Sequence, residues 1–380
     1  MIIQRRLRPR KKSFFLLGAR GTGKSTWLKG IFKEGLFLDL LDEDLFFQLQ
    51  TDKGLLGRIL EQAQQEWIII DEFQRIPELL NTVHRYIEKG KKFVLSGSSA
   101  RKLKRTGVNL LAGRALDLRM HPFLPSELGS TFSLEKALHR GLLPSVYFDE
   151  EAQATLHSYT TFYIKQEIQA EALVRNLPSF LRFLKVSSLC HGQPINLSTL
   201  AREAEISRST ATGHLEILID TLLAHLLPAF TPKLRIREKH SPKFFLFDCG
   251  IARVLKHGSN SLQPDDLGHL FEGLLLQILL AYKEYDGLCE EISYWAPSKS
   301  SIEVDFILQK GDEFIAIEAK YTQRIRKEHL KGLESLSNVA ACKRRILVYP
   351  GTLPQKTEDQ IEILPFSLFE ALLASGTLFK

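Results

Sequence analysis

The chain has 380 residues, of which 44% are hydrophobic and 25% charged, a globular composition that excludes a disordered or fibrous protein. The longest apolar stretch, Leu274 to Tyr282, is shorter than the roughly 20 apolar residues that a membrane-spanning helix requires. The apolar run after the basic start is too short for a signal peptide. The net charge of +7 permits a nucleic-acid partner.

The four cysteines lie far apart and form no C-x-x-C pair. A disulfide framework and a zinc knuckle are therefore disfavoured, and we expect a cytoplasmic protein in a reducing compartment. Residues 1–12 carry six basic side chains and no acid, which is typical either of a solvated arm or of an arm that contacts phosphates.

Up to about Ser130, short apolar runs alternate with amphipathic stretches. The runs that we expect to form buried strands are Phe14–Leu17, Leu36–Leu40, Trp67–Ile70, Phe93–Leu95 and Ala115–Leu118. The stretches that we expect to form helices are Thr26–Lys33, Leu55–Glu66 and Glu78–Glu88. This alternation predicts a five-stranded parallel sheet with helices on both faces.

The sequence GARGTGKS follows the first expected strand and fills every position of G-x-x-x-x-G-K-[ST]. Its glycines let the backbone close around a phosphate, and the N-terminus of the next helix supplies a positive field. Lys24 would contact the β- and γ-phosphates, and the Ser25 hydroxyl would bind Mg²⁺. We therefore expect ATP and Mg²⁺ as cofactors, with ADP as the product. The expected nucleotide-binding residues of this loop are Gly18, Ala19, Arg20, Gly21, Thr22, Gly23, Lys24, Ser25 and Thr26.

Two carboxylates end the third expected strand. Asp71 suits the metal side of the phosphate site, and Glu72 is placed to act as the general base that polarises the attacking water. Paired acids after a strand also occur as solvated turns or helix caps. The complete phosphate loop some fifty residues earlier favours the catalytic interpretation.

With both motifs present, this segment resembles the AAA-type ATPases, whose sheet has a strand between the phosphate-loop strand and the metal-site strand. The resemblance implies that Phe93–Leu95 is that strand and that Ser98, at its end, is a polar sensor of the γ-phosphate. It also implies that Arg114 is a catalytic arginine finger in a homo-oligomer such as a ring. A turn-forming serine and a surface arginine are the alternatives. The segment departs from the family because it is compact and no second sensor arginine can be identified.

Residues 134–230 are expected to be mostly helical, and residues 195–230 have the rhythm of a helix-turn-helix. Ser198 and Ser207 are the expected N-caps of its two helices. The second helix has an expected core stripe of Ala211, Leu215, Leu218 and Leu222. Its early polar face, which includes His214, would face a partner.

Two apolar strands, Leu226–Phe230 and Phe244–Phe247, flank a basic segment and predict a winged helix with a basic wing. Such a module suits the phosphates and grooves of duplex or branched DNA. The residues expected to contact DNA are Arg208, Thr210, Lys233, Arg235, Arg237 and Lys239. A winged helix that docks only onto protein, with a solvated basic loop, is the alternative.

Near the C-terminus, residues 301–308 and 314–320 alternate in polarity and are joined by a turn, which predicts a hairpin. Glu318 and Lys320 project together from the second strand, and Asp305 would lie beside them on the first. Two carboxylates and an amine in this arrangement make a Mg²⁺ site with a lysine that orients water.

This spacing resembles the PD-(D/E)xK nuclease superfamily. The resemblance implies an additional acid from an upstream helix, which Glu272 matches, so the expected metal ligands are Glu272, Asp305 and Glu318, with Lys320 completing a nuclease-like site. Val304 stands where the family name has proline. A solvent-exposed charged strand and a nuclease-like domain that binds without cleaving are the alternatives, so nuclease activity is left open.

The order of elements resembles prokaryotic ATPases that carry such a C-terminal domain of unknown function, and the resemblance covers nearly the whole chain. We expect a P-loop AAA-type ATPase domain at 1–130, a helical linker with a winged helix at 131–262 and an α/β nuclease-like domain at 263–380. The predicted function is a Mg²⁺-dependent ATPase that couples hydrolysis to DNA remodelling or translocation, of the helicase or branch-migration kind. The alternative is a nucleotide-gated signalling or defence switch whose C-terminal domain is an effector or docking module.

Overall fold

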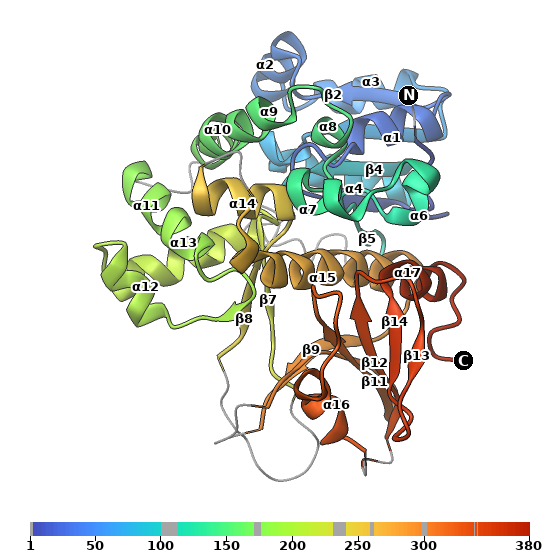
Figure 1. Ribbon diagram of the computed structural model, residues 1–380. Helices are drawn as coiled ribbons and strands as arrows, with labels where there is room; N and C mark the ends of the chain where they lie inside the picture. Colours follow the sequence, from blue (N-terminus) through green and yellow to red (C-terminus); the bar gives the residue numbers. More distant parts are fainter. Residues whose placement is uncertain are drawn as a thin grey trace. The chain divides into compact units, whose positions relative to one another are not determined.

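The chain divides into two compact units (Figure 1). The N-terminal unit comprises residues 5–122 with 216–223, and the C-terminal unit comprises residues 123–215 and 224–380 with the first few residues. The computed structural model describes residues 3–99, 113–170, 176–230, 241–258, 262–297, 302–337, 339 and 341–380. The second and third expected domains thus fall in one compact unit, and the division into three domains stays a prediction.

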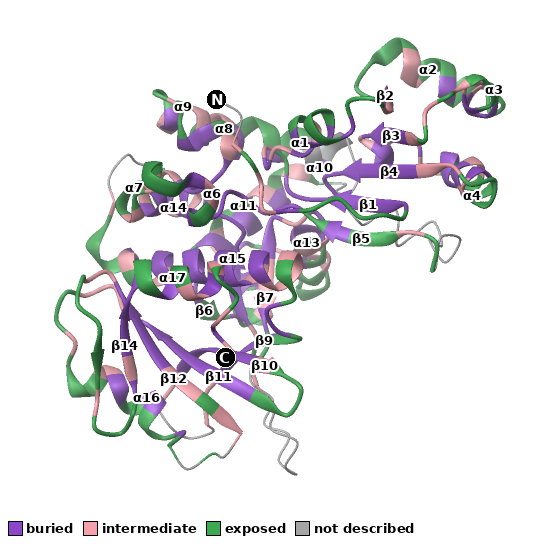
Figure 2. Ribbon diagram, turned by 90° about the vertical axis from the view of Figure 1, so that its right-hand side faces the viewer, coloured by how far each residue is buried: buried purple, intermediate pink, exposed green. Residues whose placement is uncertain are grey.

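The N-terminal unit is built on a five-stranded parallel sheet in the order β2-β3-β4-β1-β5. Its strands are β1 (Phe14–Leu17), β2 (Leu36–Asp39), β3 (Trp67–Asp71), β4 (Lys92–Gly97) and β5 (Leu116–Arg119). The prediction of a five-stranded parallel sheet is confirmed. Strand β4 lies between β1 and β3, as the resemblance to AAA-type ATPases implied. Figure 2 shows β1, β3 and β4 buried.

Helices cover both faces of this sheet. They are α1 (Lys24–Ile31), α2 (Glu43–Thr51), α3 (Leu55–Gln62) and α4 (Leu80–Glu88), with 3-10 turns at Phe73–Arg75 and Pro77–Leu79. Leucines of α2, α3 and α4 pack with Ile68 and Ile70 of β3 in one core. On the opposite face, Phe32 at the end of α1 packs on Trp67, with ring centroids 4.8 Å apart.

All helices of this unit differ from expectation: α1 begins and ends two residues earlier, α4 begins two residues later, and α2 and α3 differ more. Helix α2 was not predicted; the Asp42 side chain caps it by accepting the N–H groups of Asp44 and Leu45, at 3.0 and 3.1 Å. Helix α3 ends at Gln62, four residues earlier than expected. The Lys91 ammonium donates to the carbonyls of Ala63 and Gln65, which therefore find partners outside a helix.

The first part of the C-terminal unit is mostly helical, as expected. Its helices are α6 (Pro125–Leu128), α7 (Leu134–Arg140), α8 (Pro144–Tyr147), α9 (Ala152–Ser158), α10 (Ile164–Ala170), α11 (Leu177–Ser188), α12 (Leu197–Glu203), α13 (Arg208–Asp220) and α14 (Cys249–His257). Strands β6 (Gln193–Pro194) and β7 (Ala224–Leu227) flank β8 (Lys243–Leu246) in an antiparallel sheet.

The caps of α12 and α13 were predicted in part. Asn196, not Ser198, caps α12: its side-chain oxygen accepts the N–H groups of Ser198 and Thr199, at 2.9 and 3.2 Å. The amide fits because it precedes the first helical residue, whereas Ser198 already lies inside the helix. Ser207 caps α13 as predicted, accepting the N–H of Thr210 at 3.1 Å.

The core stripe expected on α13 is buried at Ala211, Leu215 and Leu218. Leu222 is only partly buried because the helix ends at Asp220 and Leu222 lies in the following turn with a φ of 60°. The turn therefore removes the last predicted position from the helical stripe.

The second part of the C-terminal unit is a six-stranded mixed sheet in the order β13-β14-β12-β11-β10-β9. Its strands are β9 (Glu291–Trp295), β10 (Val304–Lys310), β11 (Glu313–Ala319), β12 (Cys342–Tyr349), β13 (Gln355–Lys356) and β14 (Glu362–Pro365); its helices are α15 (Leu267–Asp286), α16 (Lys331–Glu334) and α17 (Phe366–Ala374). The predicted hairpin is present: β10 and β11 pair antiparallel, with Phe306 opposite Ile317. Within the described parts of the chain, no helix combines the length and apolar composition needed to cross a membrane.

Candidate functional site

The loop between β1 and α1 owes its shape to glycines. A Cβ atom at Gly18 would lie 2.5 Å from the carbonyl oxygen of Met120, so no side chain fits there. Gly23 adopts a φ of 92° directly before α1, a conformation that favours glycine. The loop therefore has the tight backbone path that a phosphate-binding loop requires.

The Lys24 side chain lies within this loop. Its ammonium donates to the carbonyls of Gly18 at 2.7 Å and Ala19 at 3.3 Å. The Thr22 hydroxyl also donates to the Ala19 carbonyl, at 2.8 Å. These contacts hold a positive charge at the point where the loop would close around phosphate oxygens.

The two nucleotide-site motifs meet at the carboxyl edge of the sheet. The Ser25 hydroxyl donates to Oδ2 of Asp71 at 2.6 Å, and the Ser96 hydroxyl donates to the other oxygen of the same carboxylate. Asp71 is buried. A hydroxyl and a carboxylate supply the oxygen ligands that Mg²⁺ prefers, so the residues present fit this ion.

Beside them, Glu72 is connected to Ser98 through a residue that was not predicted. Nε2 of Gln74 donates to Oε2 of Glu72 at 2.5 Å and to Oγ of Ser98 at 3.1 Å. Gln74 is only 6% exposed, and a Cβ at Gly97 would lie 2.2 Å from its amide oxygen. The glycine therefore leaves space for the glutamine. The available signal in the sequence was a polar residue three positions after Asp71, in a turn that returns to the same sheet edge.

Glu72 also has a left-handed backbone, with a φ of 55°. This conformation is uncommon for a residue with a side chain and costs on the order of 1 kcal/mol or more. It turns the chain sharply at the end of β3, so that the neighbouring carboxylates Asp71 and Glu72 engage different partners.

Arg5, in the basic N-terminal segment, contacts the loop between β1 and α1, in a role that was not predicted. Its guanidinium donates to the carbonyl of Thr22 at 2.8 Å and to the carbonyls of His121 and Pro122 at 2.6 and 3.1 Å. This side chain therefore ties the phosphate loop to the segment that follows β5.

Arg114 does not lie at the phosphate loop of its own chain. It precedes β5, at the edge where the parallel strands begin, and its guanidinium pairs with Glu88 at 3.0 Å. The phosphate loop follows the opposite end of β1. Arg119, in contrast, ends β5 opposite Leu17 in the strand register, which places a basic residue at the phosphate-loop edge.

A second group of charged side chains gathers in the C-terminal unit. Glu272 from α15, Asp305 from β10, Glu318 from β11 and Lys320 were predicted together, and the structure brings them together. The Lys320 ammonium lies 2.5 Å from Oε1 of Glu318 and 3.7 Å from Oδ2 of Asp305. That same Asp305 oxygen accepts the N–H of Ala319 at 2.9 Å.

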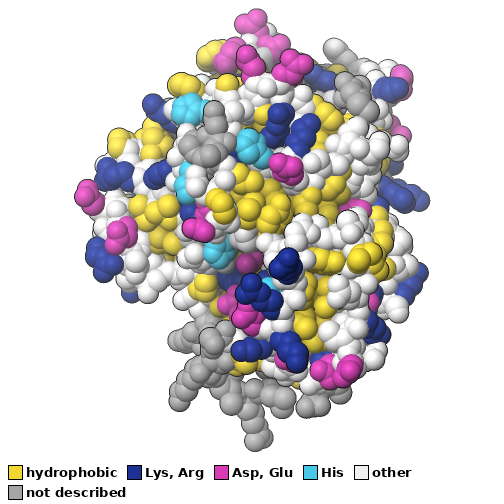
Figure 3. All heavy atoms as spheres, viewed as in Figure 1, with side chains coloured by type: hydrophobic (Ala, Val, Ile, Leu, Met, Phe, Trp, Pro, Cys, Tyr) yellow, Lys and Arg dark blue, Asp and Glu magenta, His cyan; other side chains and the backbone are white. Residues whose placement is uncertain are grey.

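Lys243, which was not predicted at this site, reaches the group from β8. Its Nζ lies 3.3 Å from Oδ1 of Asp305 and 3.5 Å from Oε2 of Glu272, and it also contacts Glu303. The side chain is only 2% exposed. We call the carboxyl groups of Glu272, Glu303, Asp305 and Glu318 the acidic cluster; the ammonium groups of Lys243 and Lys320 lie among them. Figure 3 shows basic and acidic side chains next to each other where the C-terminal sheet lies.

Burial and charge shift the titration of this cluster. Burial raises the pKa of the Glu272 carboxyl to about 8, and the neighbouring Asp305 carboxylate acts in the same direction. The same two causes raise the pKa of Glu318 to about 8. Burial alone would raise the pKa of Asp305, but Lys320 and Lys243 stabilise its charged form, and the pKa is lowered as a result.

Metal binding by these carboxylates stays a prediction. Among the residues that the structure describes, no group of three or more His, Cys, Asp and Glu side chains is arranged to hold a metal ion. The ammonium of Lys243 lies where the carboxylates from α15 and β10 converge.

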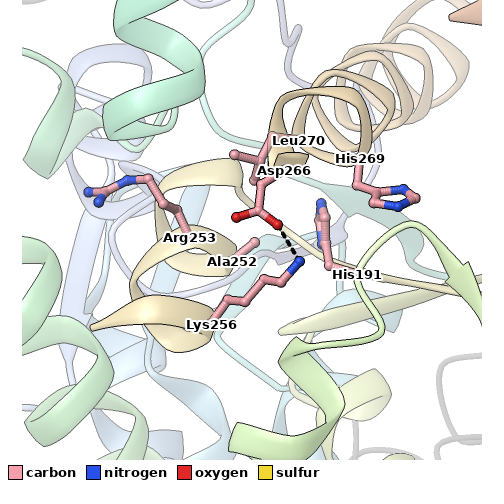
Figure 4. Close-up of a pocket in the computed structure, with 7 residues that line it drawn as sticks. All are labelled: His191, Ala252, Arg253, Lys256, Asp266, His269 and Leu270. Carbon is pink, nitrogen blue, oxygen red and sulfur yellow. Dashed lines mark hydrogen bonds and ion pairs between the residues drawn. The ribbon is translucent and has the colours of Figure 1, made fainter. Parts of the chain in front are cut away.

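A small pocket lies near the start of α15 (Figure 4). It is lined by His191, Ala252, Arg253, Lys256, Asp266, His269 and Leu270. Lys256 and Asp266 form an ion pair in it, and Arg253 extends away to donate to the carbonyl of His139 at 2.9 Å. Burial lowers the pKa of His191 to about 3, so its ring is neutral. These contacts describe an internal polar network.

The expected DNA contacts lie only partly in the described chain. Arg208 is exposed at the start of α13, and Thr210 is partly exposed, with its hydroxyl 2.8 Å from that of Ser207. His214 does not face a partner: it is buried, contacts the Ser179 hydroxyl at 3.0 Å and packs against Phe180. Its place on α13 puts it beside the core stripe. The wing residues Lys233, Arg235, Arg237 and Lys239 lie outside the described residues.

An uncharacterized protein of Mycobacterium bovis and one of Mycobacterium tuberculosis are each 24% identical to this chain over 321 residues, which is 82% of this chain and 70% of theirs. A protein from Vibrio cholerae with a known crystal structure shares 12% identity over 96% of both chains, at a TM-score of 0.23, too low to support a conclusion.

Three segments of the chain match known families. Residues 131–262 and 267–369 match two domains of unknown function, DUF8612 and DUF4143. Residues 10–129 match the family described as AAA domain. This match agrees with the phosphate loop, the Ser25–Asp71 contact and the strand order. The match supports a P-loop AAA-type ATPase domain in the N-terminal region, followed by two segments that match domains of unknown function.

Proposed function

We propose that this chain is a Mg²⁺-dependent ATPase that couples ATP hydrolysis to the binding and remodelling or translocation of DNA. The observation that carries the proposal is the set of contacts at one sheet edge. Ser25 meets Asp71, and Gln74 connects Glu72 with Ser98. The side chains for binding phosphate, holding a cation and activating water thus lie together.

Each side chain has a role in this proposal. Lys24 binds the β- and γ-phosphate oxygens, and Ser25 and Asp71 hold Mg²⁺, which neutralises phosphate charge when bound. Glu72 orients the attacking water and accepts its proton. Gln74 fixes the position of the Glu72 carboxylate and couples it to Ser98, which contacts the γ-phosphate.

The proposed DNA contact rests on helices α11, α12 and α13 and the strands next to them. The proposed winged helix is supported by the order α11, β6, α12, α13, β7, β8, in which short antiparallel strands accompany three helices. Helix α13 buries one face and exposes Arg208 at its start, where a helix would meet phosphates or a groove. The basic residues between β7 and β8 belong to the same proposal.

We also propose a homo-oligomer in which Arg114 reaches the site of a neighbouring chain. Its side chain is 43% exposed, and its pair with Glu88 is an exposed one, which contributes little stability and is easily given up. Particle size measured with and without a non-hydrolysable ATP analogue tests this assembly. A particle that stays monomeric with the analogue contradicts it.

The C-terminal hairpin, the acid on α15 and the lysine after β11 support a nuclease-like fold for the last domain. We assign it a role in holding DNA. Cleavage is not part of this proposal, because the ammonium groups of Lys243 and Lys320 already lie beside Asp305 and Glu318, the carboxyl groups that a catalytic metal would need.

The test is ATP turnover by the full chain with and without duplex or branched DNA. DNA should raise the turnover of the parent. Lys24→Ala should abolish nucleotide binding, whereas Glu72→Gln should bind ATP and fail to hydrolyse it. Lys29→Ala, which changes an exposed lysine on the same helix, is the matched control. Turnover that DNA does not change, with nucleotide retained through purification, would instead favour the nucleotide-gated switch.

A further inference from the structure

We infer that the Lys243 ammonium takes the place of a divalent cation in the acidic cluster, so that the cluster is closed to Mg²⁺ and Mn²⁺ while Lys243 lies there. The inference concerns the C-terminal unit alone and does not rest on the proposed ATPase or DNA-binding activity.

The geometry around Lys243 is that of a central cation. Its Nζ lies 3.3 Å from Asp305 and 3.5 Å from Glu272, and it contacts Glu303 as well. These carboxylates come from β10, from α15 and from the segment just before β10. Separate parts of the chain thus direct carboxyl oxygens at one nitrogen.

The lysine belongs to another element of the fold. It is the first residue of β8, in the three-stranded sheet of β6, β8 and β7. It does not belong to the β10–β11 hairpin that carries Asp305. Because its side chain is 2% exposed, solvent does not share the position. A buried ammonium must be compensated by nearby negative charge, and the Asp305 carboxylate supplies it.

A metal ion and this ammonium compete for the same oxygens. Oδ1 of Asp305 faces Lys243, while Oδ2 faces Lys320 and accepts the N–H of Ala319. Mg²⁺ binds oxygen at about 2.0–2.1 Å and would have to occupy the space of the ammonium. Both cannot lie between Asp305 and Glu272, and their positive charges repel each other. Metal binding therefore requires Lys243 to leave.

A purely structural ion network makes a different prediction. If the carboxylates lie together only to satisfy Lys243, its removal should leave a destabilised cluster with no affinity for a cation. If Lys243 stands in for a cation, its removal should create a metal site from Asp305, Glu272 and their neighbours. Methionine at position 243 keeps much of the lysine's length and removes its charge, so it separates the two cases.

The experiment measures Mn²⁺ binding by electron paramagnetic resonance in the full-length, nucleotide-free protein. All variants carry Ser25→Ala, so that the Ser25 hydroxyl contributes no ligand. The parent to which they are compared carries the same substitution. Lys243→Met should bind about one Mn²⁺ per chain that the parent does not bind, and Lys243→Met/Asp305→Asn should lose it again. Lys256→Met, which removes the lysine of another ion pair in the same unit, should gain no metal.

Two results overturn the inference. One is a folded Lys243→Met protein that binds no more Mn²⁺ than the parent. The other is measured without changing Lys243 and so stays decisive even if Lys243→Met does not fold. In that measurement, millimolar Mn²⁺ should leave the melting temperature of the nucleotide-free parent unchanged. A rise in the parent that Asp305→Asn lacks shows that the cluster takes the metal with Lys243 in place.

Discussion

Replacing Gln74 by alanine tests the connection between the proposed general base and the proposed sensor. The change removes the donor to Oε2 of Glu72 at 2.5 Å and to Oγ of Ser98 at 3.1 Å. It leaves the Lys24 contacts and the Ser25–Asp71 hydrogen bond intact. Gln74→Ala should therefore bind ATP as the parent does and hydrolyse it more slowly.

The size of the effect follows from the hydrogen bond. A bond to a charged group contributes about 1.5–3 kcal/mol, and about 1.4 kcal/mol corresponds to a tenfold change in rate. If that energy orients Glu72 in the transition state, turnover falls about 10- to 100-fold. Glu72→Gln removes the base itself and should cost more, about 10²- to 10⁴-fold.

The assay is steady-state ATP turnover together with the affinity for a fluorescent ATP analogue. Gln64→Ala, which changes an exposed glutamine before β3, is the matched control and should behave as the parent. Gln74→Ala at the parental rate, with Glu72→Gln inactive, would refute the positioning role of Gln74. Equal loss of rate and of nucleotide affinity would assign Gln74 to the shape of the loop.

Other outcomes follow from the same structure. Arg119→Ala should weaken nucleotide binding because Arg119 lies at the phosphate-loop edge, whereas Arg114→Ala should reduce turnover without weakening binding; titration with the fluorescent analogue separates them. Arg208→Ala should reduce the slope of log affinity for duplex DNA against log salt by about 0.9, if it neutralises one phosphate. The pKa values of Glu272 and Glu318 are raised to about 8 in the folded protein, so the unfolded chain releases these two protons at lower pH than the folded chain does. The free energy of unfolding of the C-terminal unit should therefore fall as the pH rises from about 5 to 8. Glu318→Gln should flatten that fall in urea unfolding measured across this pH range.

The N-terminal sheet was predictable because β1, β3 and β4 are short, buried apolar runs. The expectation that all five strands are buried was wrong at β5, where only Leu118 is buried, and β2 is mostly half-buried. The expected and observed bounds of β1 are the same, and those of the other four strands differ by one or two residues. Helix α2, which was missed, buries only Leu49 fully, and its start depends on the cap at Asp42. The end of α3 was missed because it depends on Lys91, a residue distant in sequence.

The residues of the candidate sites also fall into two groups, those that a local motif places and those that depend on partners distant in the sequence. The placement of Lys24, Ser25 and Asp71 follows from local motifs, in which the spacing along a strand or loop fixes the position of each side chain. Arg5 contacts a carbonyl 116 residues away, and Lys243 contacts a carboxylate 62 residues away. Spacing within a motif carries no information about such partners, so neither residue could be assigned its place from the sequence.

The hydrogen-bond and ion-pair partners of a carboxylate decide whether a cation can bind it. Asp71 and Asp305, each on a strand, differ in these partners. Asp71 is held by the hydroxyls of Ser25 and Ser96, which are neutral donors, so Mg²⁺ can approach without displacing a charge. Asp305 is held by the ammonium groups of Lys243 and Lys320, so a cation must first displace one of them. The sequence pattern is that of an acid on an apolar strand in both cases. The different partners support the proposal of Mg²⁺ at the phosphate loop and of an internal ammonium in the acidic cluster.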